Sequence, residues 1–107
     1  MPGIEDFLSK IKDEGVEKAK EDFRTLFNEA KGDAEGFVRE LAKDLEGWLV
    51  LLAMGEMKKN EVELLVRSRK RELEQKLNTL EIKTKARVEK IVMGLVDIVL
   101  DTLLKKF

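Results

Sequence analysis

Apolar residues recur at steps of three and four along almost the whole chain, and this periodicity constrains the fold more than any other feature. Such spacing places apolar side chains on one face of an α-helix, whereas a half-buried strand needs them at every second position. Pro2 is the only proline, so no later residue breaks a helix by that route. The sequence therefore predicts an all-α protein, and its 107 residues suffice for a single domain over 1–107.

Glycines and capping residues divide this pattern into three expected helices. Gly32 is expected to end the first helix, and Asp33 to cap the second, which Gly55 then ends. Gly15 weakens the first helix by about 1 kcal/mol relative to alanine but is not expected to stop it. The expected helices span about 4–31, 33–55 and 61–106.

The third segment allows two architectures. Asn60 is expected to cap it, and no glycine or proline interrupts its apolar seam before Gly94. Because Leu77 and Leu80 remain in phase, we expect one continuous helix, giving an antiparallel helical bundle of coiled-coil-like hairpins with a long C-terminal helix. The alternative is a monomeric four-helix bundle, broken near Asn78.

The end of that helix is apolar over a wider arc than one neighbour covers. Between Ile91 and Leu104 the apolar arc is roughly 240°, whereas packing on one helix needs about 100°. A continuous third helix would project beyond the two shorter ones, so we expect a homo-oligomer, with a dimer favoured. The residues expected in the oligomer interface or core are Trp48, Leu49, Leu52, Ile91, Val92, Leu95, Val96, Ile98, Val99 and Leu103.

Charge is distributed unevenly along the chain. Residues 1–57 hold 8 basic and 14 acidic side chains, a net of −6, whereas residues 58–90 hold 11 basic and 6 acidic ones, a net of +5. The basic run is a candidate nucleic-acid patch, formed by Arg67, Arg69, Lys70 and Arg71. The absence of aromatic residues from 58 to 106 disfavours nucleic acid. We expect the run instead to pair with the acidic residues at 13–22 of the first helix.

The composition disfavours an enzyme. Cysteine, histidine and tyrosine are absent, and neither Ser9 nor Ser68 lies in a Gly-x-Ser-x-Gly motif. Three carboxylates share a helical face in the expected first helix, Asp13, Glu17 and Glu21, but nearby lysines and the helical spacing disfavour a metal ion. We expect no catalytic residue, no metal and no cofactor.

These observations predict a non-enzymatic structural or interaction protein that self-associates through its apolar C-terminal helix, with a further protein partner as an additional role. The alternative is an amphipathic protein that lies on a lipid or other hydrophobic surface without spanning a bilayer. The charged N-terminus and the lack of cysteine favour a cytoplasmic location. Abundant Glu and Lys beside few Asn and Gln is a composition often met in thermophilic proteins.

Overall fold

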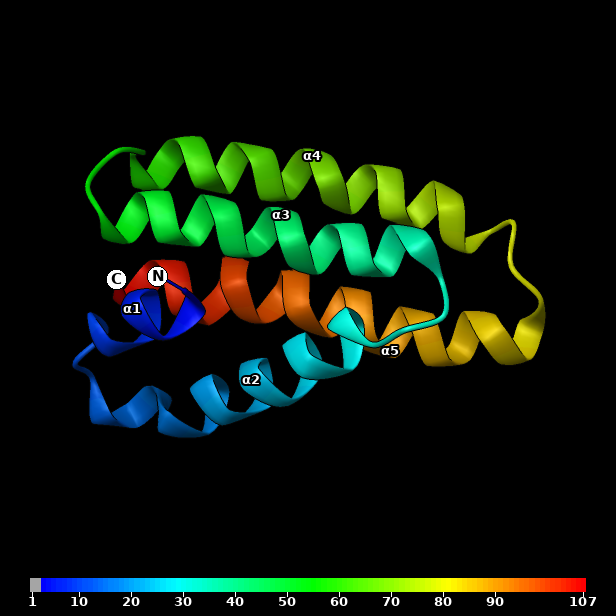
Figure 1. Cartoon of the computed structure of the whole chain (residues 1–107), viewed down its shortest axis with the longest axis horizontal. Helices are drawn as coiled ribbons and strands as arrows, with labels where there is room; N and C mark the ends of the chain where they lie inside the picture. The colour runs from blue at the N-terminus through cyan, green and yellow to red at the C-terminus, as the bar shows by residue number, and fades with distance from the viewer. Residues whose placement is uncertain (1–2) are drawn as a thin grey trace.

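The computed structural model describes residues 3–107, and over that range the chain is a helical bundle without strands. Four longer helices lie side by side, and the short α1 packs at the end where the two termini meet (Figure 1). The predicted all-α bundle is therefore confirmed. The elements are α1 (Ile4–Ser9), the 3-10 turn η1 (Glu14–Val16), α2 (Glu17–Lys31), α3 (Gly36–Ala53), α4 (Lys59–Leu77), α5 (Ile82–Ile98), the π-helical turn η2 (Val99–Leu103) and α6 (Leu104–Lys106).

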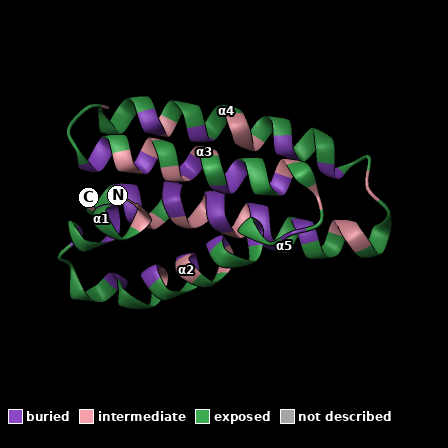
Figure 2. Cartoon of the chain, viewed as in Figure 1, coloured by how far each residue is buried: buried purple, intermediate pink, exposed green. Residues whose placement is uncertain are grey.

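The apolar stripes of all these helices meet in one core, and buried residues, purple in Figure 2, occur along every helix. α5 packs most closely on α2 and also contacts α3 and α4. At the end of the bundle, Phe7 of α1 stacks on Phe107 with ring centroids 5.2 Å apart. The chain's two ends are thus joined through the core.

The expectation of one helix over 61–106 is wrong, and the alternative break near Asn78 is present. α4 ends at Leu77, and the Lys76 carbonyl accepts hydrogen bonds from both the backbone N–H (3.1 Å) and the hydroxyl (2.7 Å) of Thr79. Glu81 then adopts an extended conformation at the N-cap position of α5, without a capping hydrogen bond from its side chain. Local side-chain bonds such as that of Thr79 compete with the helical ladder, and the reversal lets α5 bury its apolar face within the chain.

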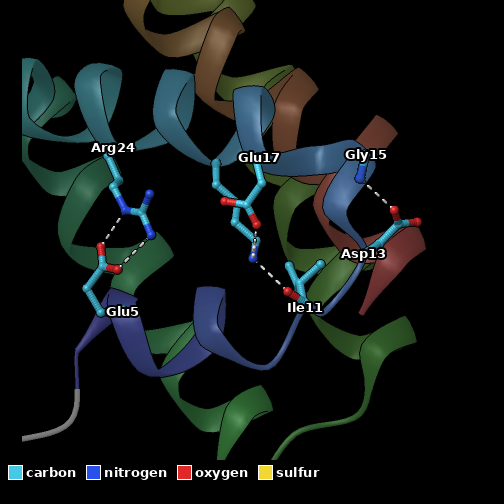
Figure 3. A network of polar contacts seen from close by, with 7 residues as sticks. Glu5, Ile11, Asp13, Gly15, Glu17 and Arg24 are labelled. Carbon is cyan, nitrogen blue, oxygen red and sulfur yellow. Dashed lines mark hydrogen bonds and ion pairs between the residues drawn. The ribbon is translucent and has the colours of Figure 1, made fainter.

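The expected first helix over 4–31 is also wrong, because the chain reverses between α1 and η1. The Asp13 carboxylate accepts the Gly15 N–H at 2.8 Å, and the ammonium of the buried Lys20 donates to the Ile11 carbonyl at 2.6 Å (Figure 3). The ion pair between Glu5 and Arg24 joins α1 to α2 at 2.8 Å. The reversal brings the apolar residues of α1 into the core rather than along α2.

Two of the predicted helix ends are confirmed, and two of the predicted helix starts are wrong. α2 ends at Lys31 with Gly32 as its C-cap, as expected. The end at Gly55 is confirmed: its φ is +79°, and the N–H groups of Gly55 and Glu56 donate to the carbonyls of Leu52 and Leu51, as in a Schellman motif. Asp33 does not cap α3, which begins at Gly36.

The buried Asp33 carboxylate instead accepts the Glu35 N–H at 2.9 Å and pairs with Arg87 of α5 at 3.2 Å. The expected cap at Asn60 is likewise wrong. α4 begins at Lys59, and the Glu61 carboxylate accepts the N–H of Lys58 at 2.9 Å. Both differences displace a helix start by two or three residues without altering the bundle.

Candidate functional site

The residues predicted for an oligomer interface or core lie mostly in the core of the single chain. The expectation that the C-terminal helix projects beyond the bundle is wrong, because α5 folds back against α2, α3 and α4. Its apolar arc is covered by three helices rather than by a second copy. Of the predicted set, only Trp48 and Ile98 are half-buried, and the others are buried: Leu49, Leu52, Ile91, Val92, Leu95, Val96, Val99 and Leu103.

Exposed apolar side chains gather instead at the α3–α4 hairpin. Among the described residues, five large hydrophobic side chains are exposed, and four of them lie on the last turn of α3, at its C-cap or on the first two turns of α4. Their exposed fractions are 36% for Leu51, 54% for Met54, 66% for Leu64 and 36% for Leu65. The fifth, Ile82, lies at the opposite end of α4, beyond the turn. This gathering is the strongest indication of an interaction surface.

Trp48 and Arg69 show how these residues face one another across the two helices. The Arg69 guanidinium lies 5.5 Å from the Trp48 ring and forms an ion pair with Asp44, which is one turn before Trp48 on α3. Leu65 precedes Arg69 by one turn on α4, and in an antiparallel hairpin it therefore lies on the same side as Trp48 and Leu51. We call the apolar set Trp48, Leu51, Met54 and Leu65 the seam face.

Charged residues continue the same side of the hairpin away from the turn. Glu40 of α3 and Arg69 and Lys76 of α4 line one hollow. The Lys76 ammonium lies 5.4 Å from the ring of Phe37, which lines the same hollow. Beyond the seam face, Glu40 and Asp44 thus lie on the α3 edge, and the α4 edge carries the basic Arg69 and Lys76 together with the acidic Glu72, with which Arg69 also pairs at 3.6 Å.

The basic run of α4 makes ion pairs inside the chain, but not with the partners expected. Arg67 pairs with Glu63 at 2.9 Å, and Arg69 pairs with Asp44.

Lys70 pairs with Asp97 of α5 at 3.0 Å, and the hydrogen bond to Asp97 raises the pKa of the Lys70 ammonium. The partners therefore come from α3, α4 and α5, and the expected pairing with residues 13–22 is wrong. Arg71 is exposed. The acidic segment from Glu17 to Asp22 lies on α2, which packs mainly on α3 and α5 rather than on α4, and this explains the difference.

The same reversal separates the three carboxylates that the sequence placed on one helical face. Asp13 lies in the loop before η1, and its pKa is lowered by the Gly15 N–H and by Lys106, with which it pairs at 3.1 Å. Glu17 and Glu21 lie on α2. Over residues 3–107, no group of three or more Asp or Glu side chains is placed to hold a metal ion.

Sequence reasoning missed Leu51, Met54 and Leu65 as surface residues. A signal for two of them was present, because the stretch from Trp48 to Met54 is apolar on all sides and needs more than one neighbour.

Within the described part of the chain, no helix is long and apolar enough to cross a membrane. Comparison with known protein families, curated proteins and solved structures finds no match to this chain.

Proposed function

We propose that this protein is a non-enzymatic helical interaction protein that self-associates as a dimer through the seam face of α3 and α4. The observation that carries the proposal is that three of the five exposed large hydrophobic side chains of the described residues, Leu51, Met54 and Leu65, lie on this one face. Exposed apolar patches of this kind are typical of protein–protein contact sites. Trp48, Leu51 and Met54 recur at steps of three on α3, so one partner surface covers all of them.

The charges beside the seam face favour a second copy as the partner. A half-turn about an axis along the seam places α3 of one copy opposite α4 of the other at the same level along the bundle. The seam face then meets itself, and Glu40 of one copy faces Lys76 of the other, whereas Arg69 keeps its partners Asp44 and Glu72 within its own chain. Opposite charges in this arrangement set the orientation of the two copies.

The contact surface also indicates how strong the association is. Fully burying a Leu or Met side chain contributes about 1.5–3 kcal/mol, but Leu51 and Leu65 are already two-thirds buried. The remaining gain must exceed the free energy lost when two molecules give up translational and rotational freedom on association, about 4–15 kcal/mol. We therefore expect a dimer that dissociates on dilution rather than one that is inseparable from folding.

Sedimentation equilibrium from low micromolar to millimolar concentration tests the proposal. The double substitution Leu51→Asp, Leu65→Asp should give monomers throughout this range while keeping the wild-type circular dichroism, because both side chains lie on the surface. Ile82→Asp is the matched control, since Ile82 is exposed but remote from the seam face. A wild-type chain that stays monomeric at millimolar concentration contradicts self-association. A monomer that binds lipid vesicles and loses that binding in the double variant supports the lipid-surface alternative instead.

A further inference from the structure

A second surface feature lies on the other flank of α3, between α3 and α2. Its first hollow has a volume of about 240 Å³, and an adjoining hollow of about 260 Å³ extends it to the start of α1. The two share Phe27, Lys31 and Glu46, so they form one groove that ends at Ile4. α1 closes that end, because it contacts α3 and is tied to α2 through Glu5 and Arg24 (Figures 1 and 3).

The floor of this groove is apolar. Phe27 of α2 and Ala42 of α3 line it and are 4% and 0% exposed, respectively. The Lys31 ammonium lies 5.4 Å from the centre of the Phe27 ring, so a cation lies directly above the aromatic floor. Because Phe27 and Ala42 are almost fully covered, they form only the base of the groove, and the charged side chains of Lys31, Arg39, Lys43 and Glu46 supply most of its walls.

The rim beside the α2–α3 turn is basic, although residues 1–57 as a whole carry a net charge of −6. Lys31, Arg39 and Lys43 line this hollow, and Glu46 is its one acidic residue. Among residues 3–107, neither Lys31 nor Lys43 has a carboxylate within ion-pair distance. The guanidinium of Arg39 donates to the Asp33 carbonyl at 2.6 Å and keeps further donors for another acceptor. Two ammonium groups and part of a guanidinium therefore remain for an anion.

The far end of the groove limits the charge of that anion. Arg24 is already paired with Glu5 through two hydrogen bonds of 2.8 Å, and Glu46 lies where the two hollows join. A polyanion laid along the groove would therefore approach these two carboxylates with Lys31, which lines both hollows, as the one cation of the far hollow outside an ion pair. The cations at one end and the apolar floor leading away from them match a molecule with one anionic end.

We propose that the groove between α2 and α3 binds a small amphipathic monoanion, with a carboxylate head between Lys31, Arg39 and Lys43 and a short apolar chain along Phe27 toward Ile4. The combined volume of the two hollows falls within the range of roughly 300–1,000 Å³ that small-molecule sites occupy. The seam face lies on the opposite flank of α3, so this site and dimer formation are independent.

The probe is octanoate, kept below its micelle concentration. Two reference ligands accompany it: octanol, which has the apolar chain without the charge, and acetate, which has the charge without the chain. We expect octanoate to shift the backbone amide resonances of Phe27, Lys31, Arg39 and Ala42, and calorimetry to show binding about ten-fold tighter than that of octanol or acetate. Octanol that binds equally well would mean a hydrophobic surface without anion recognition. Acetate that binds equally well would mean that the apolar floor is not used, and shifts at other residues would exclude the groove. Each of these results overturns the proposal.

Charge substitutions at the rim provide a second, independent test of anion binding in the groove. Lys31→Gln with Lys43→Gln should weaken octanoate binding about five-fold, because each exposed charge contributes a modest attraction. Glu46→Gln should strengthen binding about two-fold, since it removes a nearby like charge. Lys12→Gln with Lys83→Gln is the matched control at exposed lysines away from the groove. Rim and control variants that bind octanoate alike would refute anion recognition by these lysines.

Discussion

Two helical glycines that look alike in the sequence have different surroundings. Gly94 of α5 faces α2, and a β-carbon there would lie 2.7 Å from Cδ1 of Leu26. Gly47 of α3 is exposed, and a β-carbon would meet no atom within 4 Å. Glycine within a helix costs about 1 kcal/mol relative to alanine. At Gly94 the missing side chain lets α2 and α5 approach closely. At Gly47 no contact within the chain requires a glycine.

Replacing each glycine with alanine should therefore change stability differently. Gly47→Ala should raise the free energy of unfolding by about 0.5–1 kcal/mol through helix propensity alone. Gly94→Ala should raise it by less or not at all, because Cδ1 of the half-buried Leu26 must move and that cost offsets the propensity gain. Urea denaturation of both variants measures the difference. Equal stabilisation by the two changes would show that the α2–α5 contact tolerates a methyl group.

At the scale of elements, α1 is a short helix attached by both apolar and polar contacts. Phe7 and Leu8 are fully buried, and the Glu5–Arg24 pair lies on the surface. A helix of six residues is unstable in isolation, so α1 depends on these contacts. The hydrogen bond from Arg24, followed by its charge, holds the pKa of the Glu5 carboxyl below its ordinary value.

This pKa shift predicts a pH dependence. The Glu5 pKa is lower in the folded chain, so at pH values between the folded pKa and the ordinary glutamate pKa the unfolded chain binds more protons at this residue. The stability that the Glu5–Arg24 pair contributes is therefore lost as the pH falls through this range. Near neutral pH, Glu5→Gln should cost a few tenths of a kcal/mol, since the pair is largely exposed. In more acidic solution the two proteins should converge. Urea titrations of the wild type and Glu5→Gln, near neutral pH and in acid, test this. If the two proteins still differ in free energy of unfolding in acid, the effect is due to lost packing.

At the scale of the whole molecule, α5 is the central helix of the bundle, since it contacts α2, α3 and α4. Leu95 is fully buried there. Leu95→Asp should unfold the protein at every concentration, because removing its packing and burying an unpaired carboxylate cost several kcal/mol. Circular dichroism should show lost helix rather than a folded monomer. A folded, monomeric Leu95→Asp variant would instead restore the original prediction that this face joins two copies.

The seam face belongs to the same scale, because it results from how the helices are arranged. The sequence marks the stretch from Trp48 to Met54 as apolar on all sides. Leu49 and Leu52 are buried within the chain, whereas Leu51 and Met54 remain exposed. Which residues are left uncovered depends on the positions of α1, α4 and α5 around α3, and no local pattern in α3 carries that information.

The all-α class, the helical stripes and the helix end at Gly55 were determined by the sequence alone, because they depend on local periodicity and on the backbone freedom of one glycine. Only the tertiary structure decided the chain reversals after α1 and α4. Leu77 and Leu80 stay in helical phase across the second reversal, so the local pattern is the same for one helix and for two. The choice depends on burying Leu95 and its neighbours on α5 against residues distant in sequence, and that free energy exists only once the bundle has formed.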